Sequence, residues 1–416
     1  MFRRLLTLDQ ARKVILDRFK PAMLGNEQIN LLDATNRVLA QDVVAAQNVP
    51  SFDRSTVDGY AVKAEDTFGA AENRPVTLNF CGTVRIGELP KTTVGKNQAA
   101  EIVTGAPIPR GADAVMMVEY TERKAEEIQV YSAVANHENI LKAGNDIKEG
   151  ETILKCGTTL GSREIGVLAA LGMGSVEVCR VPRVAVLSTG PELAEPGKKL
   201  SPGKVFDINA YSLSSAILES GGEAIYSGVV EDNFSELQRA LRKALASADM
   251  VVTSGGVSVG PLDLMPKAVA SLGTPGVIFS GIAIKPGKPT TFAVIDGKPV
   301  FSLPGHPTSA LLVFHLLVRP AIRLITNRKP EDDLMLEASA RARMFSAKGR
   351  RTFVMVKLRA NESHEILAEP VQRGESGAIS LLARADGFVE IPENVQFVDV
   401  NDRVSVHLFR SKTFSF

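Results

Sequence analysis

The clearest pattern of hydrophobic and polar positions lies in the middle of the chain, where short apolar runs alternate with amphipathic segments. Compact apolar runs predict strands, and segments with apolar residues every three or four positions predict helices. The predicted strands are 183–187, 223–230 and 250–253, and the predicted helices between them are 208–219 and 235–246. Strands that alternate with helices in this way are typical of a three-layer α/β/α domain with a mostly parallel sheet.

Two further signals complete this domain. Asp296-Gly297 lies between the apolar runs 290–295 and 300–303, which predicts a two-residue hairpin at the edge of the sheet. The apolar segment 307–326 predicts a long closing helix with a kink at Pro320.

The flanking regions have different patterns. Thr7 and Gln10 have the spacing of a capping box, and the apolar positions that follow form one helix face before Pro21. Short β-rich runs separated by Gly and Pro occupy 48–139, and a helix is expected at 163–171. The C-terminal part contains strand-like runs at 353–358, 388–391 and 404–409, which favours a small β-barrel or sandwich.

We therefore expect a multidomain protein of α/β and β units. The expected units are a discontinuous N-terminal linker domain of residues 1–47 and 140–179, an inserted β-rich domain of residues 48–139, a central α/β domain of residues 180–328 and a C-terminal small β-barrel of residues 331–416.

Composition and charge exclude several classes of protein. The 416 residues carry 48 Lys+Arg and 47 Asp+Glu, a formal net charge of +1, which argues against a general nucleic-acid binder. Aromatic residues make up only 6% and Trp is absent, so a base-stacking platform is also poorly supplied. No uninterrupted apolar stretch reaches the roughly 18 residues needed to span a bilayer, and the N-terminus lacks the apolar core of a signal peptide. We expect neither nucleic acid nor a membrane among the partners.

The cysteines and histidines indicate the compartment. Three cysteines form no CxxC pair, and five histidines show no local ligand spacing. We therefore expect neither a disulfide framework nor a structural zinc site. Few and unpaired cysteines are typical of a reducing compartment, and we expect a cytoplasmic location.

Candidate chemistry follows the predicted strands of the α/β domain, because ligands of open α/β sheets bind beyond the carboxyl ends of the strands. Three loops leave such ends, at 188–193, 231–233 and 254–263. They bring Glu192, Asp232, Asp263, the hydroxyls of Ser254 and Ser258, and the Gly255-Gly256 pair, whose backbone N–H groups can approach an anion. The glycine-rich loop matches neither a Walker A sequence nor GxGxxG, and an ordinary turn is the alternative interpretation.

The next two turns add positive charge. Lys285-Pro286-Gly287-Lys288-Pro289 places two lysines, Lys285 and Lys288, on a proline-stiffened turn that suits an oxyanion or phosphate, although a solvated surface turn has the same composition. Pro304-Gly305-His306-Pro307 precedes a helix N-terminus, which also favours anions. A histidine in such a turn is more often structural than catalytic.

Polar clusters also occur in the N-terminal part of the chain. They are 53–61 with Asp58, 104–113 with Thr104, and Asp146. Each is compatible with ordinary turn chemistry. Together they supply several carboxylates in addition to the two lysines, the inventory of a Mg²⁺-assisted site for a phosphorylated substrate.

The motifs occur together in an order that resembles one family. They are 53–61, 104–113, 188–193, 254–263, 285–289 and 303–310, with 349–351 and 376–380 near the C-terminus. In this order and at these spacings the chain closely resembles the MoeA family of molybdopterin molybdenumtransferases, which is related to the E domain of gephyrin. The resemblance covers essentially the whole chain.

The resemblance implies a fold and an activity. It implies a central molybdopterin-binding α/β domain in an elongated homodimer, with the site between the α/β domain of one subunit and the N-terminal β region of the other. The implied reaction is Mg²⁺-dependent hydrolysis of adenylylated molybdopterin, with release of AMP and insertion of molybdate into the dithiolene. A molybdopterin adenylyltransferase is a candidate partner that would hand over the substrate.

The resemblance also implies residue roles. The implied catalytic residues are Asp58, Glu192, Asp263 and Lys285, with Glu192 and Asp263 as metal ligands. The implied substrate-binding residues are Thr104, Asp146, Asp232, Ser254, Gly255, Gly256, Ser258, Lys288, Pro304, Pro307, Arg350, Ser376 and Ser380.

Three positions depart from the pattern of the family. Pro191 stands where the family usually has Asp, His306 where it usually has Asn, and Gly281 where some members carry a lysine. These departures leave open a tungstate-inserting or diverged member. A non-catalytic dimeric scaffold is a further alternative. Enzymes that share only the α/β module, the molybdopterin adenylyltransferases and the competence-damage nucleotide hydrolases, are disfavoured by the 53–61 motif and the C-terminal β domain.

Overall fold

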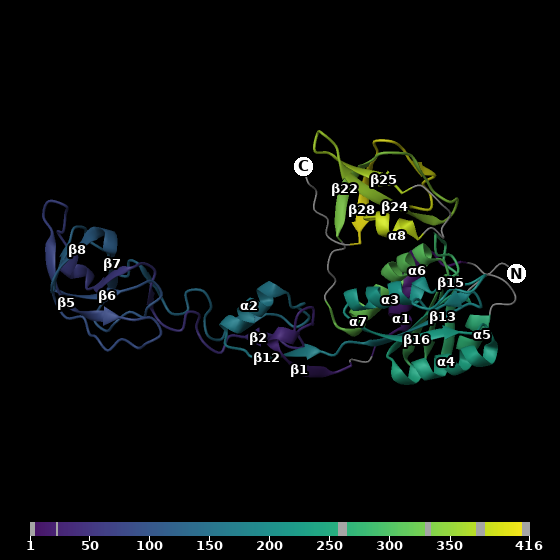
Figure 1. The fold of residues 1–416 in the computed structure, drawn as a ribbon, viewed down its shortest axis with the longest axis horizontal. Helices are drawn as coiled ribbons and strands as arrows, with labels where there is room; N and C mark the ends of the chain where they lie inside the picture. Colours follow the sequence, from purple (N-terminus) through teal and green to yellow (C-terminus); the bar gives the residue numbers. More distant parts are fainter. Residues whose placement is uncertain (1–4, 22–23, 257–263, 329–333, 372–378, 410–416) are drawn as a thin grey trace.

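The computed structural model describes residues 5–21, 24–256, 264–328, 334–371 and 379–409. Figure 1 shows an elongated chain with a β-rich domain at one end and a small linker domain in the middle. The α/β domain forms the other end, and the C-terminal domain packs beside it. The polypeptide therefore runs out to the β-rich end and returns through the linker domain before it forms the α/β domain.

The α/β domain is built on a six-stranded sheet of order β16-β13-β17-β21-β20-β18. Its strands are β13 (Arg183–Thr189), β16 (Glu223–Val230), β17 (Met250–Ser254), β18 (Pro275–Ser280), β20 (Thr291–Ile295) and β21 (Lys298–Leu303). β16, β13, β17 and β21 are parallel, and β20 and β18 are antiparallel to their neighbours. This agrees with the mostly parallel sheet that the sequence predicts.

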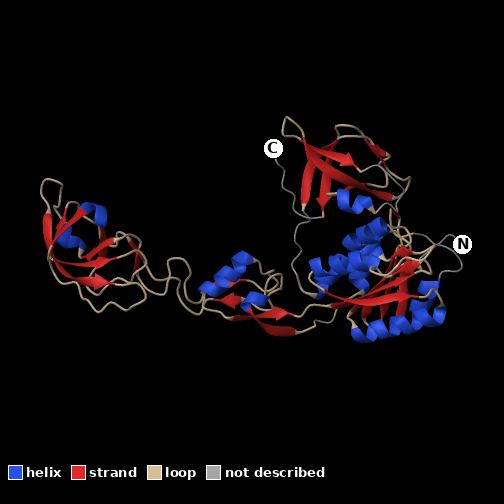
Figure 2. Cartoon of the chain, in the orientation of Figure 1, coloured by secondary structure: helices blue, strands red, loops and turns tan. Residues whose placement is uncertain are grey.

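Helices cover both faces of this sheet (Figure 2). They are α3 (Ile208–Glu219), α4 (Phe234–Ser247), α5 (Leu264–Ala270), α6 (Pro307–Val313) and α7 (Arg319–Ile325). One apolar cluster joins α3, α6 and α7 to side chains such as Val186 and Phe301, and a second joins α4 and α5 to side chains such as Leu187 and Val251. Because neighbouring strand residues alternate between the faces, each strand contributes to both clusters.

The predicted hairpin is present, but it does not form the edge of the sheet. Asp296 and Gly297 connect β20 to β21 with φ values of 49° and 85°, as a two-residue turn of the primed type requires. β18, which the sequence pattern did not reveal, pairs with the outer side of β20 and takes the edge position.

The closing helix is interrupted where the sequence predicts a kink. A π-helical segment, η4 (Phe314–Val318), separates α6 from α7 and ends just before Pro320. Proline has no N–H for the preceding turn, and a π segment is one way in which helices accommodate this. The run Pro307–Ile325 has 19 residues and contains an 18-residue window with a mean hydropathy of 1.5, enough by length and composition to cross a membrane, but 67% of that window is buried in the protein. It is the core helix of the α/β domain.

The first helix belongs by its packing to the α/β domain, whereas the sequence analysis assigned residues 1–47 to the linker domain. α1 (Leu8–Arg18) begins with the predicted capping box, in which Thr7 and Gln10 bond reciprocally. Its buried face, including Leu8 and Ile15, packs in the same apolar cluster as α3 and α6. Helix periodicity identifies a buried face but does not identify what covers it.

The linker domain is formed by small paired elements from two stretches of the chain. They are β1 (Asn26–Asn30) with β12 (Ser175–Cys179), β2 (Val43–Val44) with β11 (Thr152–Leu154), η1 (Leu31–Asp33) and α2 (Ser162–Ala170). A separate cluster that includes Leu39, Leu160 and Leu168 forms its core.

The β-rich domain has a six-stranded sheet of order β7-β4-β6-β5-β9-β8. Its elements are β4 (Gly59–Val62), η2 (Ala64–Thr67), β5 (Val76–Val84), β6 (Gln98–Ile102), β7 (Ala114–Met117), η3 (Val118–Tyr120), β8 (Thr121–Lys124) and β9 (Glu127–Val130). The short pair β3 (Arg54–Ser55) and β10 (Ile140–Leu141) lies where the chain enters and leaves this domain.

The C-terminal domain is a closed five-stranded barrel. Of the two folds that the sequence favours, barrel or sandwich, the structure has the barrel. Its elements are β22 (Met335–Ala340), β23 (Met344–Phe345), β24 (Arg351–Ala360), β25 (Ile366–Pro370), α8 (Ser380–Arg384), β26 (Gly387–Ile391), β27 (Phe397–Val398) and β28 (Arg403–Leu408). The barrel closes because β24 pairs with both β25 and β26. β19 (Ile284–Lys285) of the α/β domain pairs with the start of β24 and joins the two domains.

The assignment of α1 to the α/β core can be tested with two neighbouring residues. Ile15 is 5% exposed in the α/β cluster, whereas Leu16 is 58% exposed. Ile15→Ala should lower the free energy of unfolding by about 2–5 kcal/mol, and Leu16→Ala should change it by less than about 0.5 kcal/mol. Chemical denaturation measures both values. Hydrogen exchange should rise in α3 and α6 of Ile15→Ala, and a rise confined to β1 and β12 would contradict the assignment.

Candidate active site

The carboxyl ends of three neighbouring strands meet at one edge of the α/β sheet. Ser188 of β13 is in register with Ser254 of β17, and Ser254 with Leu303 of β21. The backbone N–H of Gly255 donates to Leu303 O at 3.3 Å, and the Ser254 hydroxyl donates to Pro304 O at 3.2 Å. The structure thus brings together the predicted residues Ser254, Gly255 and Pro304.

The Gly255-Gly256 pair is required by a close backbone approach. Gly255 has φ +93° and Gly256 has φ +64°, conformations that favour glycine. A Cβ on Gly255 would stand 2.2 Å from the carbonyl oxygen of Thr189. A Cβ on Gly256 would stand 3.7 Å from a carboxylate oxygen of Asp232. Asp232 therefore lies beside the glycine loop, although β13 separates β16 from β17 in the sheet.

Asn209, which the sequence pattern did not reveal, is a buried residue that bridges Ser254 and Gly305. It is 8% exposed, and its Nδ2 donates to Ser254 Oγ and to Gly305 O, both at 2.7 Å. It lies in the first turn of α3, where the N-cap residue Asp207 accepts the N–H of Ala210 at 3.0 Å. An amide in the first turn of α3, directly after the N-cap Asp207, is the signal that could have identified it.

Buried hydroxyl groups without partners lie beneath these loops. Within the ranges that the structure describes, the side-chain oxygens of Ser188, Thr189, Thr253, Ser302 and Thr308 are buried and accept or donate no hydrogen bond. Each is less than 5% exposed. Buried polar groups normally have a hydrogen-bond partner, so a cluster without protein partners at one sheet edge is a place where a ligand or an ordered water can bind.

Glu192 lies on an exposed loop that continues into β14 (Leu193–Ala194), which pairs with β15 (Val205–Phe206). Val205 N donates to Glu192 O at 2.8 Å, and the Glu192 carboxylate folds back over Gly190. The Lys204 ammonium group donates to the carbonyl of Pro191. Pro191 stands where the family usually has an acid, and its backbone carbonyl is contacted by Lys204.

Lys285 is exposed on β19, in register with Thr352 at the start of the barrel strand β24. Arg350 directly precedes that strand, so a cation from the α/β domain and one from the barrel lie at the same two-strand ladder. Gly281 has φ +92°, and a Cβ there would stand 2.7 Å from the Leu5 side chain. The Leu5 side chain therefore lies against Gly281 and would have to shift to admit a larger residue there.

The remaining predicted residues of this end lie nearby along the chain. Lys288 is half-buried, and its carbonyl accepts the N–H groups of Ile282 and Thr290 at 3.0 Å. Pro307 is in the first turn of α6, and His306 is its exposed N-cap residue without a side-chain cap bond. Ser380 begins α8, on the side of the barrel that faces α6 in Figure 1. Three other predicted residues, Ser258, Asp263 and Ser376, lie outside the described residues.

Asp58 and Thr104 form a separate pair in the β-rich domain. One carboxylate oxygen of Asp58 accepts the backbone N–H of Thr104 at 2.7 Å and its hydroxyl at 2.9 Å. These two hydrogen bonds, the backbone one first, hold the pKa of Asp58 below its ordinary value. The sheet of this domain lies at the opposite end of the molecule from β13 and β16 (Figure 1). One chain therefore does not bring Asp58 and Thr104 to the α/β site.

Asp146 also lies away from the α/β site. It is exposed in the segment that returns to the linker domain, where its backbone N–H donates to Val49 O at 3.1 Å.

No group of three or more His, Cys, Asp and Glu side chains that could hold a metal ion occurs among the described residues. Mg²⁺ needs fewer protein ligands, because it is commonly bound by one or two carboxylates together with substrate phosphates and water. Glu192 and Asp232 are exposed carboxylates on loops at the strand ends and supply the oxygen donors that this ion prefers.

The fold and the site define a multidomain protein with a candidate anion site at the carboxyl ends of a mostly parallel sheet. Three family descriptions match successive parts of the chain: MoeA N-terminal region (domain I and II) at 6–172, probable molybdopterin binding domain at 185–324, and MoeA C-terminal region (domain IV) at 337–409. The chain belongs to the MoeA family.

Relatives match over nearly the full length. A molybdopterin molybdenumtransferase of Haemophilus influenzae is 34% identical over 97% of this chain and 99% of its own. A putative molybdopterin biosynthesis protein of Methanocaldococcus jannaschii is 32% identical over 99% of this chain and 100% of its own. A crystal structure of a molybdopterin biosynthesis MoeA protein from Pyrococcus horikoshii is 42% identical, with a TM-score of 0.85 over 98% of this chain and 100% of that one.

The close approach at Gly255 can be tested against a glycine of similar conformation. Gly197 has φ +88° with nothing within 4 Å of a built Cβ, so Gly197→Ala carries only the cost of the left-handed conformation, about 1–2 kcal/mol. Gly255→Ala should lower the free energy of unfolding by clearly more, because the Thr189 carbonyl must move. Urea denaturation compares the two variants, and equal losses would contradict the account.

The hydrogen bonds to Asp58 predict how its pKa responds to substitution. Thr104→Val removes the hydroxyl bond and leaves the backbone bond, so the pKa of Asp58 should rise toward its ordinary value without reaching it. NMR titration of the carboxyl carbon measures this, with Thr121→Val as a control that should leave the pKa unchanged. A lowered pKa stabilises the folded protein above the unfolded value of 3.8, and this stabilisation is lost as the pH falls through the folded value. The variant should therefore lose the stabilisation at a higher pH than the wild type does, and an unaltered pKa would contradict the assignment.

Proposed function

We propose that this chain is a molybdopterin molybdenumtransferase, which hydrolyses adenylylated molybdopterin, releases AMP and inserts molybdate into the dithiolene. Membership of the MoeA family assigns it a role in molybdenum cofactor biosynthesis, and full-length relatives carry the transferase name. The observation that carries the proposal is the glycine loop above unpaired buried hydroxyls, with Asp232 beside it. This is a polar site for an anionic ligand at the position where α/β sheets bind their ligands.

The loops and cations suit the two anions of the reaction. The Gly255 N–H is already bonded to Leu303 O. Because neither Gly255 nor Gly256 carries a side chain, the loop would still let a phosphate or the pterin approach the backbone closely. Lys285, Lys288 and Arg350 supply positive charge for the substrate phosphates or for the incoming molybdate, and Arg350 can bind an oxyanion through two N–H groups. Ser258, Ser376 and Ser380 would add hydroxyl donors, and Pro304 and Pro307 would shape the turn.

The carboxylates suit the hydrolytic step. Glu192 and Asp263 would hold Mg²⁺ and orient the attacking water, with Asp232 beside the glycine loop. When bound, Mg²⁺ would supply charge neutralisation at the substrate phosphate. The water oxygen would add to the adenylyl phosphorus as the bond to the molybdopterin phosphate breaks, so that AMP leaves. The proton released from water would pass to a carboxylate or to solvent.

We also propose that the working enzyme is a homodimer. Asp58 precedes β4 and Thr104 follows β6 of the β-rich domain, whereas Glu192 follows β13 of the α/β domain. Figure 1 shows these two domains at opposite ends of the molecule. If both sets take part in one reaction, the β-rich domain of one subunit must reach the α/β domain of the other. Asp146, on the exposed return segment, would then also face the partner.

Release of AMP tests the activity. The wild type with Mg²⁺ and molybdate should release AMP from adenylylated molybdopterin, and Glu192→Gln and Asp263→Ala should lower the rate by about 100-fold or more. Glu219→Gln, an exposed carboxylate at the far end of α3, should change nothing. Calorimetric titration with Mg²⁺ should show weaker binding to both site variants. Tungstate in place of molybdate decides between the two oxyanions, and a folded dimer without AMP release would favour the scaffold alternative.

Mixed dimers test whether two chains form one site. Asp58→Ala and Glu192→Gln should each be inactive alone. Random mixing after dissociation should restore about a quarter of the wild-type activity, because half of the dimers are mixed and each has one intact site. A mixture that stays inactive while the subunits exchange would contradict the shared site. Adding a molybdopterin adenylyltransferase to the wild type would show whether that partner delivers the substrate.

A further inference from the structure

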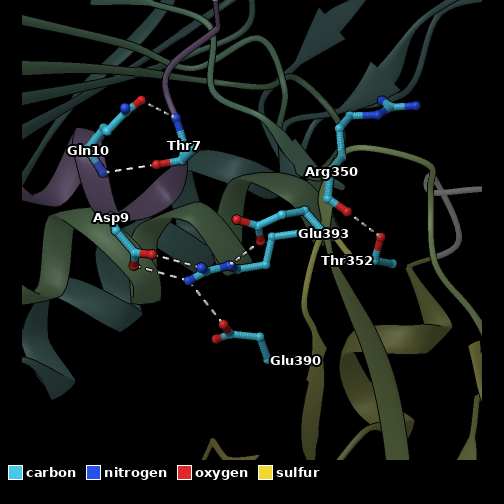
Figure 3. A network of polar contacts seen from close by, with 8 residues as sticks. Thr7, Asp9, Gln10, Arg350, Thr352, Glu390 and Glu393 are labelled. Carbon is cyan, nitrogen blue, oxygen red and sulfur yellow. Dashed lines mark hydrogen bonds and ion pairs between the residues drawn. The ribbon is translucent and has the colours of Figure 1, made fainter. Parts of the chain in front are cut away.

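Arg351 contacts carboxylates from two domains. Figure 3 labels these carboxylates, Asp9, Glu390 and Glu393. Its two terminal nitrogens donate to both carboxylate oxygens of Asp9, at 3.0 and 2.7 Å. Nη1 also lies 3.1 Å from Glu390 Oε1, and Nε lies 3.1 Å from Glu393 Oε2. Asp9 belongs to α1, which packs in the α/β core, whereas Arg351, Glu390 and Glu393 belong to the barrel. The network therefore joins the two domains.

This network differs from an ordinary surface ion pair. The Arg351 side chain is 16% exposed, and the pair with Asp9 is bidentate, the geometry in which guanidinium–carboxylate contacts are strongest. Burial alone would lower the pKa of Arg351, but the hydrogen bonds to Asp9 and Glu393 and the charge of Glu390 outweigh it and raise the pKa. Isolated exposed pairs contribute little because solvent screens them and both side chains lose freedom. A mostly buried arginine between three carboxylates holds a defined geometry instead.

The backbone of Arg351 continues the connection. Its N–H donates to Ala283 O at 3.0 Å, and Ile284 and Lys285 of β19 are in register with Arg351 and Thr352. Ala283 N in turn donates to Leu6 O at 2.7 Å. Three distant segments of the chain thus meet at this point.

The side chains of the β19–β24 pair point to two opposite sides. Successive strand residues point in opposite directions, so Ile284 and Arg351 share one side while Lys285 and Thr352 share the other. Ile284 is fully buried, which fixes the orientation of the ladder. Lys285 is consequently directed away from the carboxylate network.

Thr352 extends this arrangement to Arg350. The Thr352 hydroxyl donates to Arg350 O at 3.2 Å and accepts Ala347 N at 2.9 Å, while Arg350 N donates to Ala347 O at 3.0 Å. The turn that carries Arg350 is therefore closed on Thr352. In Figure 3 the side chain of Arg350 points away from Asp9, Glu390 and Glu393.

We propose that Arg351 is a positioning residue, which fixes the barrel against α1 so that Arg350 and Lys285 face the same oxyanion. The proposal deepens the proposed function and rests on it, because it takes these two cations as the oxyanion site. Arg351 itself contacts carboxylates and does not bind the anion. Its effect should therefore appear in affinity for the oxyanion and not in the rate of hydrolysis at saturation.

Calorimetric titration with molybdate tests the proposal. Arg351→Gln should weaken molybdate binding at least about tenfold, since misplacing a binding group by a small distance is costly. Arg351→Lys, which retains the charge but loses the bidentate geometry, should give an intermediate loss. Asp9→Asn should act in the same direction from the other domain. In AMP release, the KM for molybdate should rise while kcat changes by less than about twofold.

Arg343→Gln is the matched control. Arg343 makes a bidentate pair with Asp399 at 3.0 and 2.9 Å, but both residues belong to the barrel and are largely exposed. This variant should bind molybdate as the wild type does. Equal binding by Arg351→Gln and Arg343→Gln would overturn the proposal, as would a loss of kcat without a change in KM.

Hydrogen exchange of the ligand-free protein separates this proposal from the proposed function. If Arg351 holds the ladder, the amides of 283 and 351 should exchange faster in Arg351→Gln than in Arg343→Gln, with β22 and β25 unaffected. Unchanged exchange would overturn the positioning role even in an active enzyme. Faster exchange in a protein that neither binds molybdate nor releases AMP would support the role of Arg351 in holding the barrel against α1. It would contradict the oxyanion function.

Discussion

The backbones of β13 and β17 come so close after their last residues that no side chain fits between them. A Cβ on Gly255 would overlap the carbonyl of Thr189, so the two loops must leave the sheet in contact. Around this contact lie the register of Ser188, Ser254 and Leu303 and the two hydrogen bonds by which Asn209 bridges Ser254 and Gly305. Asp232 lies beside the same loop. The site at this edge is thus a consequence of close packing between parallel strands.

Signals that act over a few residues were sufficient for much of the fold. The reciprocal bonds of Thr7 and Gln10, the spacing of apolar residues in α3 and the turn at Asp296-Gly297 are local properties, and the structure agrees with each prediction. Contacts between distant residues were not accessible in this way. The partner of α1, the strand β18 outside the hairpin and the bond from Asn209 to Ser254 depend on which surfaces meet, and periodicity does not specify that. Arg351 and Asp9 are 342 positions apart, and neither lies in a pattern that indicates the other.

The candidate site also has a part that local sequence patterns predict and a part that they do not. The residues that follow strand ends were predictable, because the topology of an open α/β sheet places those ends at one edge. The Asp58–Thr104 pair was identified by motif, but its remoteness from that edge depends on how the linker domain extends, which no short motif encodes. In the proposed homodimer, activity would depend on the geometry between the subunits as well as on the packing of each chain.

The position of α1 also constrains how the molecule can be made. α1 is synthesised before the rest of the α/β domain, but its apolar cluster includes Phe314 and Ile322, which the ribosome adds roughly 300 residues later. At a translation rate of about 5–20 residues per second, on the order of 15–60 seconds pass between the synthesis of α1 and that of the closing helix. The linker and β-rich domains have clusters of their own and can form in that interval. They behave topologically as one long insertion between the first helix and the first strand of a single domain. Nascent chains should therefore expose the apolar face of α1 throughout most of translation and recruit it only when the closing helix emerges.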